Sequence, residues 1–390
     1  MANDFVASMV LAIWVYLLIA RGGFWRARER DETFLAGTGP WPAITAVIPA
    51  RDEAECVGKT VASLLRQDYP GAFSVILVDD QSRDATAQVA RDAAVAIGVP
   101  QRLTVLAGRA LPAGWTGKLW AQHQGVEAAL AVAPPPTYLL LTDADIVYAP
   151  DALKALVAQA QSGGYVLTSL MAKLRCESLA ERIFIPAFIF FFQMLYPFAW
   201  ANDPRRPTAA AAGGCMLVRG DALARAGGMA AIRSALIDDC ALAKTLKAQG
   251  PIWLGLTQRV CSVRAYPALG DIRRMVSRSA YAQLRYSPLL LAGTVVGLAI
   301  TYLAPVVLAI FASGMARLLG MSAWLLMVLA FQPTLRFYRL SPLWGVALPA
   351  IAAGYMAFTV DSAYQHARGR GGMWKGRAQA NVQQNVSELR

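Results

Sequence analysis

The clearest pattern along the chain is a set of four long runs without a charged residue. They cover residues 5–20, 286–316, 318–335 and 340–360. A helix needs roughly 20 apolar residues to cross the hydrocarbon core of a bilayer, and these runs are at or near that length. We therefore expect an N-terminal transmembrane anchor (1–24), a C-terminal transmembrane region (286–360) and a basic tail (361–390).

Between these runs, short apolar segments alternate with amphipathic ones. The apolar segments predict strands at residues 43–49, 74–80, 102–108 and 138–145, and the amphipathic spacing predicts helices at 55–67, 84–97 and 118–132. This alternation is typical of an α/β domain, a mainly parallel sheet covered by helices. We expect that domain to occupy residues 42–285.

Composition and charge support a membrane-anchored body. Of the 390 residues, 56% are hydrophobic and 16% charged, which is too apolar for an ordinary soluble protein. Basic residues such as Arg21 and Arg26 follow the first run, and the positive-inside rule then places the body in the cytoplasm. The net charge of +12 suits anionic lipid and phosphorylated substrates. We expect no nucleic-acid partner, because no nucleic-acid-binding motif is present.

The candidate chemistry is carried by acidic pairs at two strand ends and one helix start. These are Asp79 with Asp80, Asp143 with Asp145, and Asp238 with Asp239. Ligands of open α/β sheets bind beyond the carboxyl ends of the strands, where carboxylates can take sugar hydroxyls or a hard divalent cation. An aspartate at such a position also serves as a turn former or helix cap, so each pair alone has a structural alternative.

Five segments, taken in order, resemble a known enzyme family. They are VIPARDEAE (47–55), VDDQSRD (78–84), TDADIVYAPD (142–151), GGCMLVRGDAL (213–223) and IDDCALA (237–243). Together they are similar to inverting family-2 glycosyltransferases, whose GT-A fold is Rossmann-like with a mainly parallel sheet. Within that family, GWTGKLWAQ (114–122), SRSAYAQLRYS (277–287), WKGR (374–377) and the terminal anchors most resemble the bacterial hopanoid-associated (hopene-associated) branch.

The resemblance implies where the donor and the metal bind. By this resemblance, the donor nucleoside would be bound by Ala50, Arg51, Glu53 and Asp80, with Asp79 supporting them. Asp143 and Asp145 would form the donor and metal site for Mg²⁺ or Mn²⁺, with Asp145 the more direct ligand. Lys118 would meet the diphosphate, although it could instead be a solvated lysine at a helix start.

The same resemblance implies the remaining roles. Gly213 and Gly214 would let the backbone approach the donor sugar closely, a use that requires residues without a side chain. Asp239 would be the general base, with Asp238 raising its affinity for a proton through like-charge repulsion. The chain departs from the QxxRW signature of processive synthases and ceramide glucosyltransferases. Arg278 is the best substitute there, for acceptor or phosphate, unless its helix simply faces lipid headgroups.

One further segment, residues 183–202, is free of charged residues and long enough to span a membrane. We expect that it does not cross. A crossing there would put Asp143 and Asp239 on opposite sides of the bilayer. We expect a membrane-interface segment that leads a lipid acceptor to Asp239, with a buried core helix as the alternative. Three later spans would leave the basic tail outside, whereas two spans, or a re-entrant segment around Pro333, would return it to the cytoplasm, as we expect.

These expectations define a multi-pass enzyme of a bacterial-type inner membrane, with its catalytic domain in the cytoplasm. It would be a metal-dependent, inverting hexosyltransferase that moves a sugar from a nucleotide-sugar, a UDP-sugar first, to a lipid acceptor such as a hopanoid. A polyprenyl-phosphate or ceramide-type glycosyltransferase is the alternative of the same class. A nucleotidyltransferase would not need the late Asp238–Asp239 pair, and a non-catalytic membrane partner is the third alternative.

Overall fold

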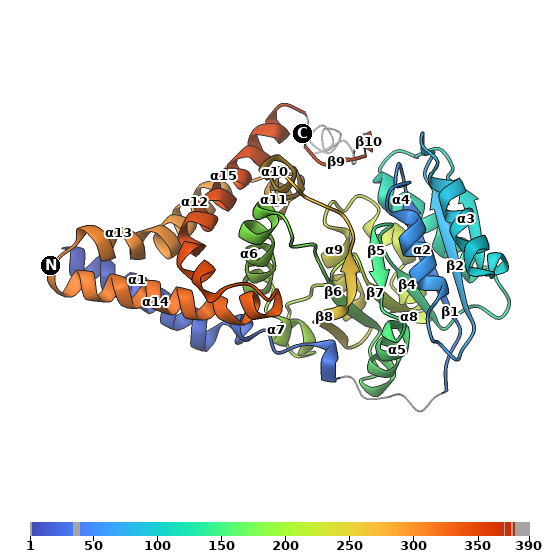
Figure 1. Ribbon diagram of the computed structural model, residues 1–390, viewed down its shortest axis with the longest axis horizontal. Coiled ribbons are helices and arrows are strands. Elements are labelled where there is room, and N and C mark those ends of the chain that lie inside the picture. Colours follow the sequence, from blue (N-terminus) through green and yellow to red (C-terminus); the bar gives the residue numbers. More distant parts are fainter. Residues whose placement is uncertain (1, 34–39, 370, 376, 379–390) are drawn as a thin grey trace. The chain divides into compact units, whose positions relative to one another are not determined.

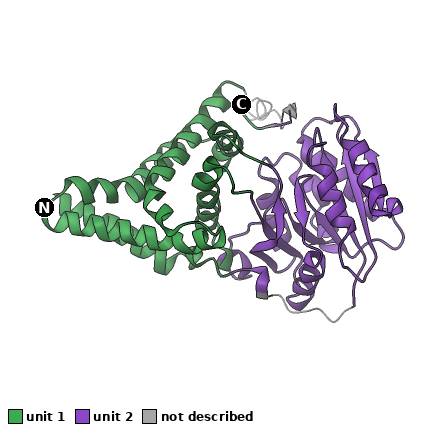
Figure 2. Cartoon of the chain, in the orientation of Figure 1, with its two compact units in different colours: residues 1–28, 175–199, 265–372 green, residues 29–174, 200–264, 373–390 purple. Residues whose placement is uncertain are grey.

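The computed structural model describes residues 2–33, 40–369, 371–375 and 377–378 (Figure 1). The chain divides into two compact units (Figure 2). The sheet unit contains residues 29–174, 200–264 and 373–390, and the helical unit contains residues 1–28, 175–199 and 265–372. Two parts of the expected 42–285 domain, residues 175–199 and 265–285, thus belong to the helical unit.

The sheet unit is built on an eight-stranded sheet in the order β3-β2-β1-β4-β7-β6-β8-β5. Its strands are β1 (Ile44–Ala50), β2 (Phe73–Asp79), β3 (Leu103–Ala107), β4 (Tyr138–Leu141), β5 (Ile146–Tyr148), β6 (Leu167–Lys173), β7 (Met216–Arg219) and β8 (Ile252–Ser262). Strands β3, β2, β1 and β4 are parallel, as are β6 and β8. Strand β7 is antiparallel to both of its neighbours, and β5 is antiparallel to β8. The predicted α/β class with a mainly parallel sheet is confirmed.

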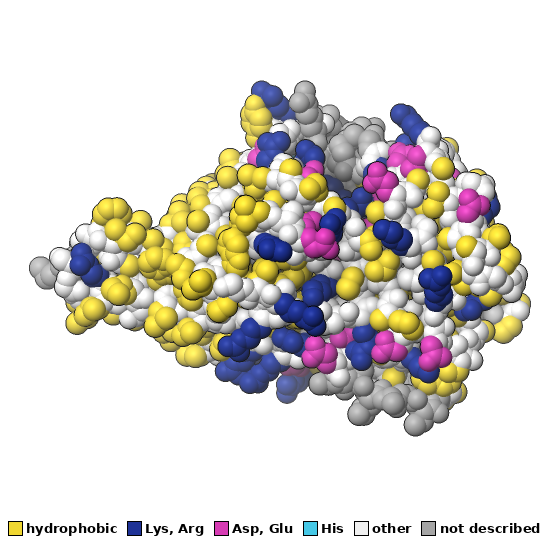
Figure 3. Space-filling view, in the orientation of Figure 1, with side chains coloured by type: hydrophobic (Ala, Val, Ile, Leu, Met, Phe, Trp, Pro, Cys, Tyr) yellow, Lys and Arg dark blue, Asp and Glu magenta, His cyan; other side chains and the backbone are white. Residues whose placement is uncertain are grey.

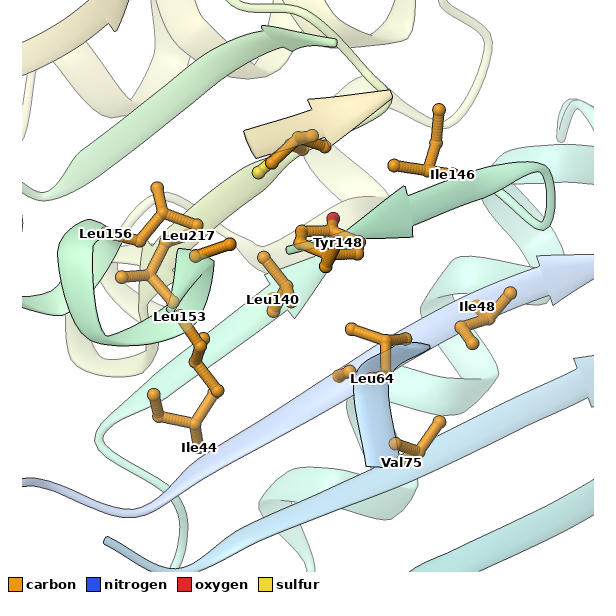
Figure 4. Packing of buried hydrophobic residues seen from close by; sticks show 14 of the residues in the cluster. Ile44, Ile48, Leu64, Val75, Leu140, Ile146, Tyr148, Leu153, Leu156 and Leu217 are labelled. Atoms are coloured by element: carbon orange, nitrogen blue, oxygen red, sulfur yellow. The ribbon is translucent and has the colours of Figure 1, made fainter. Parts of the chain in front are cut away.

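Helices cover both faces of this sheet. They are α2 (Val57–Leu65), α3 (Thr86–Ile97), α4 (Gly117–Leu130), α5 (Ala152–Ser162), α8 (Gly220–Arg225) and α9 (Asp238–Lys247). Successive strand residues point to opposite faces, so Ile48 of β1 packs in one core with Leu64 of α2, while Val47 packs in the other with Leu119 of α4. Figure 4 shows the first of these cores. Burial on both faces explains why β1 is continuously apolar rather than alternating.

The predicted strand at 138–145 is too long. Strand β4 ends at Leu141, and the chain turns before β5, which pairs with β8 on the far edge of the sheet. Asp143 and Asp145 therefore lie in the connection rather than in a strand. The sequence pattern does not predict strands β5 to β8; β5 and β7 are only three and four residues long.

The helical unit consists almost entirely of helices, most of them apolar. They are α1 (Ala2–Ala20), α6 (Leu179–Leu195), α10 (Leu269–Ser277), α11 (Ala280–Gln283), α12 (Pro288–Leu298), the π-helical η5 (Ala299–Leu303), α13 (Ala304–Phe311), α14 (Gly314–Phe337), the short η6 (Pro342–Ala347) and α15 (Leu348–Ala367). A 3-10 turn, η1 (Phe24–Arg26), follows α1, and α7 (Phe198–Asn202) lies where the chain passes back to the sheet unit. Helix α1 packs along α14, and the indole N–H of Trp14 donates to the carbonyl of Thr301 at 2.8 Å.

Four helical stretches of this unit are long and apolar enough to cross a membrane. They are Asn3–Ala20, Pro288–Phe311, Gly314–Phe337 and Pro342–Ala367. On the face shown in Figure 3, hydrophobic side chains dominate the surface of these helices. In α6, by contrast, Phe190 is fully buried against Phe24 and Phe331. The burial of Phe190 agrees with the alternative in which residues 183–202 form a buried core helix.

Candidate active site

The site forms where three parallel strands end. Strands β1, β2 and β4 run in the same direction, so Ala50, Asp79 and Leu141 lie at one edge of the sheet. The acidic residues predicted at the strand ends follow directly. Parallel pairing therefore gathers at one rim residues that lie far apart in the sequence.

Just after β1 and β2, an arginine and a buried aspartate hold the two strand ends together at this edge of the sheet. The Arg51 guanidinium donates to the carbonyl oxygen of Asp80, and its Nη1 lies 3.8 Å from the Asp80 carboxylate. Asp80 is completely buried, and its N–H donates to the carbonyl oxygen of Ala50 at 2.8 Å. The Asp79 carboxylate accepts the N–H of Ser82 at 3.0 Å, so Asp79 has the turn-forming role weighed as its structural alternative.

Gly108, after β3, shows how tightly this rim is packed. A Cβ at Gly108 would lie 2.9 Å from the carbonyl oxygen of Asp79 and 3.0 Å from Cα of Asp80. Both neighbours are main-chain atoms, which cannot move aside as the end of a flexible side chain can. The close approach requires glycine.

Arg264 joins the β1 end to the Asp143–Asp145 turn. Antiparallel pairing of β5 with β8 brings the start of β5 beside the end of β8, and the Asp145 carboxylate accepts from the Ser262 hydroxyl at 2.8 Å and from Arg264 Nε at 3.1 Å. Arg264 Nη2 also donates to both carboxylate oxygens of Glu53, at 2.8 and 2.7 Å. Arg264 therefore holds one carboxylate of the expected nucleoside site and one of the expected metal site.

Lys118 joins Asp143 to the start of α9. It lies in the first turn of α4, whose N-cap Thr116 accepts the N–H of Leu119. Its Nζ is 2.8 Å from Asp143 Oδ1 and 3.0 Å from Asp238 Oδ2. Burial alone would lower the pKa of Lys118, but the two carboxylates outweigh burial and raise it above the ordinary value. Lys118 is thus a fixed cation rather than a solvated lysine.

Asp239 lies beside this lysine. Its Oδ2 accepts the N–H of Gly213 at 3.0 Å, and its Oδ1 accepts the N–H of Cys240 at 2.7 Å. A Cβ at Gly213 would lie 3.4 Å from Lys118 Nζ and 3.6 Å from Asp239 Oδ2, so a side chain there would come close to both groups. Burial, reinforced by the charge of Asp238, raises the pKa of Asp239 to about 6.

Asp238 and Asp239 are not the N-cap residue of α9. The N-cap residue is Ile237, and Asp238 and Asp239 occupy the first turn of the helix proper. Neither is therefore the cap weighed as the alternative. A carboxyl group whose pKa lies near neutrality and that lies beside a glycine is suited to accept a proton from a hydroxyl.

Gly214 supports the turn from behind. Its carbonyl oxygen accepts the hydroxyl of Thr142 at 2.8 Å and that of Tyr148 at 3.2 Å. A Cβ at Gly214 would meet Ile146 and Ala172 at 3.1 and 3.3 Å. Gly214 thus packs against the protein, whereas Gly213 lies close to Lys118 and Asp239.

The residues present fit a divalent cation held mainly by a substrate. Among the residues that the structure describes, no group of three or more His, Cys, Asp or Glu side chains is placed to hold a metal ion. Mg²⁺ typically uses one or two carboxylates together with substrate phosphates, and the turn supplies Asp143 and Asp145. Both are paired with cations, Lys118 and Arg264, so a metal ion would share or replace those contacts.

Arg278 belongs to the helical unit. It is an exposed residue that caps the C-terminus of α10 in the helical unit. Its proposed contact with acceptor or phosphate stays a prediction.

Two basic residues at the site have no role in the sequence analysis. Arg264 follows β8. Its position, as a basic residue just after a strand, is the sequence feature that could have indicated a role at the site. Lys375 occurs in the WKGR segment, which was noted only as part of the resemblance. In the structure Lys375 Nζ lies 3.2 Å from Glu53 Oε1 and donates to the carbonyl oxygen of Asp52 at 2.9 Å.

Comparison with known proteins agrees with this geometry. Residues 45–226 match the model of the family Glycosyl transferase family 2. Residues 45–226 thus form a domain similar to glycosyltransferase family 2. The sheet and its strand-end site have the GT-A fold, and a mannosyltransferase from Pyrobaculum calidifontis, solved in complex with GDP-Man and Mn²⁺, shares it. That structure has a TM-score of 0.52 at 16% sequence identity, with 94% of this chain and 99% of that chain covered.

Relatives of the glycosyltransferase domain include two curated enzymes. An N-acetylglucosaminyltransferase of Mesorhizobium japonicum is 33% identical over 149 residues, which are 37% of this chain and 32% of that protein. A 4,4'-diaponeurosporenoate glycosyltransferase of Staphylococcus aureus is 33% identical over 124 residues, which are 31% of this chain and 29% of that protein. The chain thus spans about a third of the length of these relatives.

Proposed function

We propose that the protein is a membrane-embedded, inverting glycosyltransferase that moves a sugar from a nucleotide-sugar to a lipid acceptor. The observation that carries this proposal is Asp239. Its carboxylate accepts the N–H of Gly213, its pKa is raised to about 6, and Lys118 Nζ also lies close to Gly213. A carboxylate with a raised pKa and a fixed cation, both close to one glycine, suit a proton acceptor near an anionic leaving group.

The chemical step follows from these positions. Asp239 takes the proton from the acceptor hydroxyl as that oxygen forms a bond to the anomeric carbon of the donor sugar. The bond from the anomeric carbon to the diphosphate breaks, and the nucleoside diphosphate leaves with the electron pair. A single displacement of this kind inverts the configuration at the anomeric carbon.

The cations of the site stabilise the leaving group. A divalent metal held at Asp143 and Asp145 would neutralise charge on the departing diphosphate. Lys118 and Arg264 already contact those two carboxylates, so both are placed to donate hydrogen bonds to the phosphates. At the other end of the donor, Arg51, Glu53 and Asp80 would hold the nucleoside.

A lipid acceptor is supported by the membrane helices and by one relative. The four apolar stretches suit an enzyme that stays in the bilayer with its acceptor. The Staphylococcus aureus relative is named a 4,4'-diaponeurosporenoate glycosyltransferase. We propose a polycyclic or polyisoprenoid lipid bearing a hydroxyl or carboxyl group, with a hopanoid as the first candidate and a UDP-sugar as the first donor.

The contact of Lys375 with Glu53 supports a specific topology. Both residues lie in the sheet unit. In the sequence, Glu53 precedes the three C-terminal apolar stretches and Lys375 follows them. We infer that the chain crosses the membrane an even number of times between Arg264 and Met373. We propose that Pro288–Phe311 and Gly314–Phe337 cross. Helix α15 would then lie at the interface, because its Asp361 accepts the hydroxyl of Ser277 of α10 at 2.8 Å.

This topology is tested by labelling a cysteine from each side of the membrane. In Ser387→Cys, the thiol should react with an impermeant maleimide only after the cytoplasmic face is opened, with the wild-type protein as the background for its own cysteines. Labelling from the outer face in intact cells would contradict the even number of crossings.

The activity is tested by nucleotide release from a panel of UDP- and GDP-sugars, with Mn²⁺ or Mg²⁺ and the protein in lipid. Asp239→Asn and Asp145→Asn should abolish metal-dependent release. Asp221→Asn is the matched control and should keep metal-dependent release. Asp221 is an exposed residue of α8 that pairs with Arg219 and Arg225. If no donor turns over even with hopanoid added, and no nucleotide binds, the proposal fails.

A further inference from the structure

The segment after the last apolar helix returns to the rim where the donor nucleoside is expected. Besides its side-chain contacts with Glu53 and Asp52, Lys375 uses its own carbonyl oxygen to accept from Arg51 Nε at 3.2 Å. A single residue near the C-terminal end thus contacts three consecutive residues after β1. These contacts lie within the sheet unit.

The local backbone is built for this contact. Lys375 follows β9 (Met373–Trp374), which pairs with β10 (Arg377–Ala378), and Trp374 is buried. Lys375 has a φ of 46° and Asp52 has a φ of 50°, so both contacting residues adopt the left-handed region, which is unfavourable for a residue with a side chain. Two such residues that meet each other indicate a specific arrangement, because strained backbone persists only where its surroundings hold it.

The charges form a continuous line from this segment to the Asp143–Asp145 turn. Lys375 contacts Glu53, Glu53 contacts Arg264, and Arg264 contacts Asp145. The Glu53 side chain is 8% exposed, whereas those of Arg264 and Lys375 are 29% and 30% exposed. The two cations are therefore the solvent-facing members of this line, and they carry the positive charge that an anionic ligand along it would meet.

We propose that Lys375 is a donor-binding residue and that the Trp374–Lys375 segment forms one wall of the donor site. A nucleoside diphosphate laid from Arg51 and Asp80 toward Asp145 would run beside Lys375 and Arg264, and the ammonium group would donate to its phosphate oxygens. This inference rests on the proposed function, since it assigns a residue to that same site.

The test compares Lys375→Met and Lys375→Arg, with Lys154→Met as the matched control. Lys154 is a lysine on α5 whose Nζ pairs with Asp68 at 2.8 Å, outside the site. The Met variant should raise KM for the nucleotide-sugar about tenfold or more and change kcat less than threefold, because a lost charge-assisted hydrogen bond weakens binding by at least that factor. The Arg variant should recover most of the affinity, and the control should match the wild type.

Binding of UDP and of uridine, each with Mn²⁺, separates this role from a structural one. If Lys375 meets the phosphates, the Met variant should lose about tenfold in affinity for UDP and less than twofold for uridine. Equal losses for both, or an unchanged KM for the donor, would overturn the proposal. A lower KM would also overturn it, because the segment would then be blocking the site.

A second variant keeps the test independent of the charge change. Trp374→Phe should retain donor turnover and lose part of the fluorescence change that UDP and Mn²⁺ cause in the wild type. An identical change in both proteins would place the segment away from the nucleotide and contradict the proposal. If UDP binds the wild type but no sugar is transferred, the proposed function fails while these binding comparisons still decide the role of Lys375.

Discussion

The two ends of the site balance their charges differently. From the nucleoside end to the expected metal site, the Glu53 and Asp145 carboxylates are matched by Arg264 and Lys375. At the sugar end, Asp143, Asp238 and Asp239 surround Lys118, which contacts the first two. The first arrangement is electrically balanced before any ligand arrives. The second has excess negative charge, which can attract a divalent cation and raises the proton affinity of the remaining carboxylate, Asp239.

The largest effect should come from removing Asp239, the proposed proton acceptor. Asp239→Asn keeps the shape of the side chain and removes its basicity, and general-base catalysis contributes about 10²- to 10⁴-fold. We expect kcat for transfer to fall by that factor while the dissociation constant for UDP with Mn²⁺ changes less than threefold. A variant that transfers sugar at more than a tenth of the wild-type rate would show that Asp239 is not the base.

Removing the shared cation should mainly affect stability. Lys118→Met leaves Asp143 and Asp238 facing each other in a largely buried site, and breaking such a pair costs about 3–5 kcal/mol. The free energy of unfolding should fall by this amount in denaturant titration. The double variant Lys118→Met with Asp238→Asn should recover part of the loss, because it also removes one of the unmatched charges. No recovery would mean that Lys118 acts through packing instead.

Gly108 tests the packing of the nucleoside end. Gly108→Ala would push a methyl group against the main chain of Asp79 and Asp80, and overpacking of this kind costs about 1–3 kcal/mol. Gly98→Ala is a poor control because Gly98 has a positive φ, whereas Gly293 has open space and an ordinary backbone. We expect Gly293→Ala to leave the melting temperature unchanged and Gly108→Ala to lower it. Equal melting temperatures would refute the close approach.

The smallest effect concerns the pH dependence of the sugar end. Asp239 must be ionised to accept a proton, so kcat/KM should fall about tenfold per pH unit below about 6. Asp238→Asn removes the neighbouring negative charge, lowers the pKa of Asp239 and moves this acid limb to lower pH by about one unit or less. The raised pKa also means that the folded state binds the proton more tightly than the unfolded one. Stability should therefore decrease as pH rises from about 4 to about 6, and Asp239→Asn should abolish that decrease.

The sequence predicts the part of this site that depends on local pattern. Asp79, Asp80, Asp143 and Asp145 follow apolar strands, and parallel pairing alone is enough to expect them at one rim. Asp238 and Asp239 open a predicted helix, and the structure places that helix turn at the same rim.

The contacts supplied by long-range pairing could not be predicted in the same way. Arg264 reaches Asp145 because β5 pairs antiparallel with β8, and β5 is only three residues long, too short for a periodic signal. Lys375 reaches Glu53 only because the chain returns to the sheet unit after its apolar helices. Burial of Phe190 in the helical unit likewise depends on long-range packing, so the sequence left both an interface segment and a core helix open for residues 183–202.

The central claim is a single displacement with Asp239 as the base, and the anomeric configuration of the product tests it most directly. With a donor whose sugar is α-linked to the diphosphate, proton NMR of the glycosylated lipid should show a β-linkage. An α-linked product would require two displacements or a front-side mechanism, and it would contradict the role assigned to Asp239.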